Sequence, residues 1–166
     1  MLRIINTRSW PVLAFLLSLS LWVGALGFEH IGGLQPCQMC YWQRHAHQAV
    51  LVISALALLV RLLAKTDNWD KLFVWLIGLA FLVSFALAFW HTGVEYKWWE
   101  GPKTCSGGGG TVDAGAILEA LSSKPTLPSC GKIPWSLFGI SMAGYNAIIS
   151  ILAALVSFTL ARRTPS

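Results

Sequence analysis

Four long stretches of the chain consist of apolar and small residues with almost no charge. A helix needs about 20 such residues to cross the hydrocarbon core of a bilayer. The pattern therefore predicts membrane-spanning helices at about 9–28, 41–63, 72–91 and 135–161. We expect an all-α membrane protein, with a single four-transmembrane-helix domain over residues 1–166.

The segments between these helices differ in length. The first outer loop covers 29–40 and the second covers 92–134, whereas the loop between the second and third helices is tight. The second outer loop contains four consecutive glycines at 107–110 and then Thr111 and Asp113, either of which is a suitable helix cap. We expect a short helix from there to about Leu121, lying along the membrane surface.

The first apolar stretch has a second interpretation, as a cleaved signal peptide. Arg3 and Arg8 would form its basic region, and the small residues at 25–27 its cleavage site. The stretch is longer than the usual signal core of about 7–15 residues. We therefore expect a retained helix.

The composition supports a membrane protein. The chain is 55% hydrophobic and 11% charged, whereas soluble domains carry about 25% charged residues. Nine tryptophans are present, and tryptophan collects at membrane–water interfaces. The net charge of +5 forms no basic stripe along the chain, so we expect the lipid bilayer and no nucleic acid as a partner.

The distribution of Lys and Arg predicts the orientation. Cytoplasmic segments close to membrane helices carry an excess of these residues. The first outer loop contains neither Lys nor Arg. Both termini are therefore expected in the cytoplasm and both outer loops on the opposite side. The basic residues on the predicted cytoplasmic side are Arg3, Arg8, Arg61, Lys65, Lys71, Arg162 and Arg163.

All four cysteines fall on the predicted outer side. Cys37 and Cys40 form a Cys-x-x-Cys motif at the start of the second helix, and Cys105 and Cys130 lie in the second outer loop. Four cysteines allow three pairings, and spacing does not choose among them. Two inert structural disulfides are one interpretation. A zinc site is less favoured because Cys105 and Cys130 are far apart in the sequence, so no metal is expected.

A redox role suits Cys37 and Cys40 better than a structural one. The start of a helix stabilises a thiolate through its unpaired N–H groups. Arg44 follows Cys40 by four residues, one helical turn on. A cation there favours a Cys40 thiolate or the oxygen of an electron acceptor. The alternative for Arg44 is an arginine that reaches to the membrane interface.

The sequence PCQMCYWQR at 36–44 resembles the Cys-x-x-Cys-x-x-x-Arg signature of the DsbB family of disulfide-bond-formation proteins. The four predicted spans, the second cysteine pair and the sequence WSLFG at 135–139 are also similar. The resemblance covers nearly the whole chain. The glycine run at 107–110 does not match it.

The resemblance implies a bacterial inner-membrane oxidase, with its cysteines on the periplasmic side. Such an enzyme reoxidises a thioredoxin-like dithiol protein, DsbA, and passes the electrons to ubiquinone or menaquinone. By resemblance, Cys105 is attacked by the reduced partner and the released Cys130 attacks Cys37. Cys40 then faces the quinone as a thiolate, with Arg44 beside both. Each step is a thiol–disulfide exchange.

His91 ends the third predicted span on the outer side, at about the depth of Arg44. We expect it to line the quinone site, with an interfacial histidine as the alternative. His45 and His47 point to different faces of the second helix, and we interpret both as packing or interfacial residues. Glu95 is placed to pair locally with His91 and is assigned no role.

Two other classes of function compete with the thiol:quinone oxidoreductase. One is a haem-binding membrane cytochrome that uses His47 and His91. The other is a structural membrane protein whose disulfides are inert.

Overall fold

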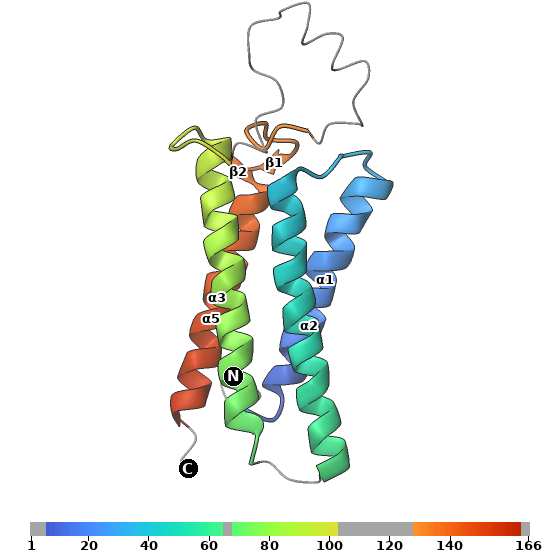
Figure 1. Cartoon of the computed structure of the whole chain (residues 1–166), viewed down its shortest axis with the longest axis vertical. Helices are drawn as coiled ribbons and strands as arrows, with labels where there is room; N and C mark the ends of the chain where they lie inside the picture. Colours follow the sequence, from blue (N-terminus) through green and yellow to red (C-terminus); the bar gives the residue numbers. More distant parts are fainter. Residues whose placement is uncertain (1–5, 65–67, 103–127, 164–166) are drawn as a thin grey trace, which may run out of the picture.

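The computed structural model of the chain describes residues 6–64, 68–102 and 128–163. In this part of the chain, four long helices run side by side along the length of the molecule (Figure 1). Each is long and apolar enough to cross a membrane. The predicted all-α, four-span architecture is confirmed. The helices are α1 (Trp10–His30), α2 (Gln38–Ala64), α3 (Asp70–Glu95) and α5 (Met142–Arg163).

The helices alternate in direction, so the bundle has two distinct ends. The described start of the chain and the end of α5 lie together at one end (Figure 1). The start of α2 and the two short strands β1 (Ser136–Leu137) and β2 (Ile140–Ser141) lie at the other. Cys37 and Cys40 are at this second end, which we call the cysteine end.

Small side chains allow α3 and α5 to pack closely. Between membrane helices, close approach of the backbones replaces the hydrophobic effect as the source of association. On α3, Gly78 lies directly against α5, where an added Cβ would be 2.9 Å from the side chains of Ser157 and Phe158. The buried residues of α5 are all small: Ala143, Gly144, Ala147, Ser150, Ala153, Ala154, Ser157 and Ala161.

His47 lies at a point where polar side chains from all four helices meet. Its Nδ1 is 3.2 Å from the hydroxyl of Ser18 on α1. Its Nε2 is 2.8 Å from Asn146 Oδ1 on α5 and 3.3 Å from the hydroxyl of Ser84 on α3. Ser150 of α5 donates a 3.1 Å hydrogen bond to the same Ser84 hydroxyl. We call these five residues the His47 cluster.

The last helix begins at Met142, later than the predicted 135, because a hairpin precedes it. Leu137 pairs with Ile140 across a two-residue turn. Both turn residues, Phe138 and Gly139, have positive φ, of 50° and 76°, as a tight hairpin turn of the favoured hand requires. This geometry prevents the helix from extending toward the loop.

The helix α3 continues to Glu95, past the predicted end at 91, so His91 and Glu95 lie on the same helix one turn apart. The predicted surface helix ending near Leu121, the glycines at 107–110 and Cys105 lie outside the described residues.

The contact at Gly78 provides a test of the α3–α5 packing. We expect Gly78→Val to lower the free energy of unfolding by about 1–3 kcal/mol, because the valine side chain would overlap Ser157 and Phe158. Thermal unfolding in detergent measures the effect. Leu79→Val is the matched control, since Leu79 is next on the helix but 48% exposed at the lipid-facing surface. Equal stability of the two variants would contradict this packing.

Candidate functional site

The start of α2 holds the first cysteine pair in contact. Cys37 directly precedes the first helical residue, and its sulfur accepts a 3.3 Å hydrogen bond from the backbone N–H of Cys40. A side chain at this position normally satisfies a free N–H of the first turn. The two sulfurs are 3.0 Å apart and both cysteines are free thiols. This separation suits hydrogen bonding between a thiol and a thiolate.

His91 of α3 approaches the same sulfur from the neighbouring helix. Its Nε2 is 3.5 Å from Cys37 Sγ. Its other ring nitrogen, Nδ1, is 2.8 Å from the side-chain amide nitrogen of Gln43. Gln43 thereby fixes the orientation of the ring. The predicted histidine and the predicted cysteine pair are therefore brought together by the fold.

These contacts act on the acidity of Cys37, which lies outside the spanning helices. The hydrogen bond from the Cys40 thiol, helped by the hydrogen bond and charge of His91, lowers the pKa of Cys37 to about 4 despite burial of the sulfur. One proton is thus shared by the pair, and Cys37 carries the negative charge. From the sequence, the thiolate of the reaction was expected on Cys40, with Arg44 as its cation.

The second cysteine pair approaches the first through Cys130. Cys130 is buried and packs in one cluster with Cys37, Met39 and Val94. Its sulfur is in a disulfide, whereas Cys105 lies outside the described residues. The fold thus places a sulfur from each predicted pair in a shared buried cluster.

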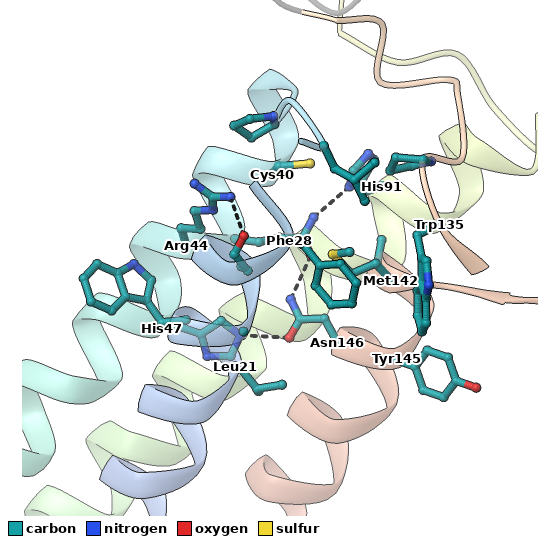
Figure 2. A pocket seen from close by; sticks show the side chains of 18 of the residues that line it. Leu21, Phe28, Cys40, Arg44, His47, His91, Trp135, Met142, Tyr145 and Asn146 are labelled. Atoms are coloured by element: carbon teal, nitrogen blue, oxygen red, sulfur yellow. Dashed lines mark hydrogen bonds between the residues drawn. The ribbon is translucent and has the colours of Figure 1, made fainter. Parts of the chain in front are cut away.

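A pocket of about 410 Å³ lies beside Cys40, between α1 and α2 on one side and α5 on the other. Its wall is mostly apolar, from residues such as Leu21, Phe28 and Trp135. Polar side chains converge at one part of the wall, among them Cys40, Arg44 and His91 (Figure 2). A largely apolar cavity with a few placed polar groups is the usual form of a small-molecule site.

Arg44 lines this pocket and is held by α1. Its guanidinium forms an ion pair with Glu29 and donates a 3.2 Å hydrogen bond to the carbonyl of Ala25. The guanidinium carbon also lies 5.5 Å from the centre of the Tyr41 ring. These contacts orient a cation along the pocket wall, which Cys40 also lines.

A hydrogen-bonded chain that was not predicted from the sequence runs along the same wall. From His91 the chain passes through Gln43 to Asn146, whose amide donates to Gln43 Oε1 at 2.8 Å, and then to His47 (Figure 2). It connects Cys37 to the His47 cluster beside the pocket. The available signal was a set of polar residues within apolar helices, which are costly and usually functional.

Glu95 is buried beside His91, one turn further along α3. Its carboxylate is almost fully buried, with its side chain 1% exposed and Oε1 3.9 Å from His91 Nε2. Its second oxygen, Oε2, has no hydrogen-bond partner among the described residues. The carboxylate is hydrogen-bonded to Ser141, so the unexplained group is this one buried oxygen, which calls for a physical reason.

Comparison with known proteins decides the family. The family model "Disulfide bond formation protein DsbB" matches residues 7–160. The chain belongs to the DsbB family. A disulfide bond formation protein B from Polaromonas sp. is 29% identical over 145 residues, covering 83% of this chain and 80% of the relative. One from Acinetobacter baumannii is 26% identical over 158 residues, covering 89% and 88%. No solved structure matches the chain.

Membership of the DsbB family confirms the resemblance and places the chain among membrane oxidoreductases of disulfide-bond formation. It disfavours a structural protein with inert disulfides. The haem hypothesis also loses its basis, because both ring nitrogens of His47 already lie within hydrogen-bonding distance of Ser18 and Asn146.

The lowered acidity of Cys37 can be measured in the reduced Cys105→Ser/Cys130→Ser chain, whose only thiols are Cys37 and Cys40. A lowered pKa keeps the thiolate present above that value and removes it below. The rate of alkylation by iodoacetamide is measured as a function of pH. We expect one thiol whose rate has its midpoint at a pH well under the pKa of about 8.5 for free cysteine. His91→Ala should raise this midpoint, and His45→Ala, at an exposed position, should not. Two midpoints near 8.5 would contradict the thiolate at Cys37.

Proposed function

We propose that this chain reoxidises a periplasmic thioredoxin-like dithiol protein of the DsbA type and passes the electrons to a membrane quinone, ubiquinone or menaquinone. The observation that carries the proposal is the placement of Cys40 in the wall of an apolar pocket, next to a buried cluster that contains both Cys37 and Cys130. The cysteines that exchange disulfides with a protein therefore lie next to a pocket in which a lipid-soluble electron acceptor can bind.

The first half of the reaction is an exchange of disulfides. A thiolate of the reduced partner attacks Cys105, and Cys130 leaves as a thiolate. The partner's second thiolate then closes the partner's own disulfide and releases Cys105. Two electrons and two protons have left the partner, and each step is a thiolate attack through a mixed disulfide.

The second half passes these electrons to the inner pair. With Cys37 and Cys40 joined as a disulfide, the thiolate of Cys130 attacks Cys37, and Cys40 leaves. Attack of Cys105 on Cys130 restores the outer disulfide and leaves Cys37 and Cys40 reduced. The packing of Cys130 against Cys37 supports this route. A free inner pair beside a disulfide-bonded Cys130 corresponds to the state that follows it.

A quinone accepts the two electrons and two protons of the inner pair, becomes a quinol, and leaves Cys37 and Cys40 as a disulfide. The pocket fits such a molecule, since its apolar wall suits an isoprenoid tail and Cys40, Arg44 and His91 provide a polar surface for the head. Arg44 provides a cation toward the oxygen that gains negative charge. His91 and Gln43 keep Cys37 oriented and charged, ready to close the disulfide.

The proposed location is the bacterial inner membrane, with both termini in the cytoplasm and the cysteine end facing the periplasm. The periplasm is oxidising, so disulfides persist there. The shared position of the described start of the chain and the end of α5, opposite the cysteines, supports placing both ends on one side of the membrane and the cysteines on the other.

Electron transfer from a reduced DsbA-like protein to ubiquinone-1 tests the function. Parent protein should reduce quinone over many turnovers, whereas Cys40→Ser and Cys105→Ser should fall to the background rate. The two variants should differ in a single turnover. Cys40→Ser retains the outer disulfide and should still oxidise up to one equivalent of partner, whereas Cys105→Ser should oxidise none by this route. His45→Ala is the control. Parent-like turnover by both variants would overturn the proposal.

The role of Arg44 makes a separate prediction. Arg44→Gln should raise the KM for quinone about tenfold or more, because a hydrogen bond from a charged donor contributes roughly 1.5–3 kcal/mol and about 1.4 kcal/mol corresponds to tenfold. Arg162→Gln, at the far end of α5, should leave KM unchanged. Glu29→Gln removes the ion pair but keeps the cation. If Glu29→Gln and Arg44→Gln raised KM equally, Arg44 would act only through its ion pair.

A further inference from the structure

Three potential metal ligands meet beside the pocket. The sulfurs of Cys37 and Cys40 and a ring nitrogen of His91 all lie within 4.8 Å of one another. Thiolate and imidazole are the groups that zinc prefers in proteins. This set differs from the four-cysteine site considered from the sequence, because it combines one cysteine pair with a histidine from another helix.

The distances are close to those of a tetrahedral zinc site. With zinc–sulfur bonds of about 2.3 Å and zinc–nitrogen bonds of about 2.0–2.1 Å, ligand sulfur and nitrogen atoms lie about 3.6 Å apart. Cys37 Sγ and His91 Nε2 are 3.5 Å apart. Two ligand sulfurs would lie about 3.8 Å apart, so the present 3.0 Å separation must widen by under about 1 Å.

One buried oxygen of Glu95, whose carboxylate is otherwise hydrogen-bonded to Ser141, is a second observation that points to a cation. The carboxylate faces the same His91 nitrogen, 3.9 Å away, while its Oε2 lacks a partner among the described residues. In a tetrahedral site, oxygen and nitrogen ligands lie about 3.4 Å apart. Glu95 does not belong to the group of ligand atoms within 4.8 Å of one another, so it supplies a negative charge beside the site and is not a fourth ligand.

We propose that the reduced Cys37–Cys40 pair and His91 bind one zinc ion, with the carboxylate of Glu95 nearby, and that bound zinc holds the chain in its reduced, inactive state. Binding releases to solvent the one proton that the two thiols share and the proton on the coordinating nitrogen of a charged His91, and involves no change of oxidation state. It requires both thiols, since sulfurs joined in a disulfide are not thiolate ligands. Oxidation of the pair therefore abolishes the site. The inference rests on the geometry of the reduced pair and not on the identity of the electron acceptor.

Zinc binding can be measured without quinone or protein partner. The full chain carrying Cys105→Ser and Cys130→Ser is reduced with a phosphine, freed of reductant and titrated with Zn²⁺ against a chromophoric chelator. We expect one zinc per reduced chain and none per chain after oxidation of Cys37 and Cys40. Absence of zinc binding by the reduced chain, or equal binding by the oxidised chain, would overturn the proposal.

Ligand variants in the same background identify the site. His91→Ala and Cys40→Ser should each weaken zinc binding by more than about tenfold, since even the loss of a group that only supports a ligand typically costs about 10–100-fold. Glu95→Gln should weaken it as well. The matched controls are His45→Ala and Glu100→Gln, at exposed positions. If His91→Ala bound zinc as tightly as His45→Ala, the metal would be held by the thiols alone and the proposed site would be wrong.

The consequence for turnover is measured in the parent chain. Zinc should stop quinone reduction when added to chain reduced beforehand, and a chelator such as EDTA should restore the original rate. Chain oxidised beforehand should still oxidise its first equivalents of the reduced partner in the presence of zinc, because the site forms only once Cys37 and Cys40 are reduced. Failure of quinone reduction without zinc would contradict the proposed function and leave the titration valid. Normal turnover of reduced chain saturated with zinc would overturn the inhibitory role.

Discussion

Polar side chains that pair between helices determine the shape of this bundle. In the hydrocarbon core, a polar group without a partner costs several kcal/mol because no water is available to replace it. The His47 cluster satisfies such groups with donors and acceptors from all four helices. The close α3–α5 packing at Gly78 and the bond from the Trp10 indole to Ser157 complete the arrangement.

The same polar contacts continue to the reactive sulfur. Asn146 belongs to the His47 cluster and also donates to Gln43, which contacts the ring of His91. The position of the ring beside Cys37 is therefore set by residues of α2 and α5 as well as by its own helix. This continuity explains how a histidine on α3 is held at a fixed distance from a cysteine at the start of α2. Chemistry that needs preorganised groups depends on such support.

The four helices could be predicted from the sequence, because an uncharged apolar run long enough to cross a bilayer is rare outside membrane helices. The cysteine motif and its family could be recognised in the same way. The start of α5 could not be placed, because the positive φ of Phe138 and Gly139 arises only in the folded hairpin. The sequence did not distinguish His45 from His47, yet His45 is exposed and His47 is buried. Periodicity alone did not show which face of α2 meets α5.

Long separation along the chain is the reason that other contacts were missed. Asn146 is 99 residues from His47 and 103 from Gln43. Glu95 and His91 were recognised as neighbours on one helix, but their approach to Cys37 depends on how α3 lies against α2. Local patterns predict which residues share a helix face, whereas contacts between distant segments depend on the packing of the whole bundle.

The partnership between Asn146 and His47 also constrains how the protein is made. Ribosomes deliver α1, α2 and α3 to the membrane before α5 exists. Until residue 146 has been synthesised, His47 and Gln43 lack their partner on α5. The partner of the Trp10 indole, Ser157, is synthesised later still. The first three helices are therefore inserted as an incomplete bundle, in which some polar side chains lack their partners. Until α5 is inserted, these side chains must be satisfied by the insertion machinery or by water at the membrane interface.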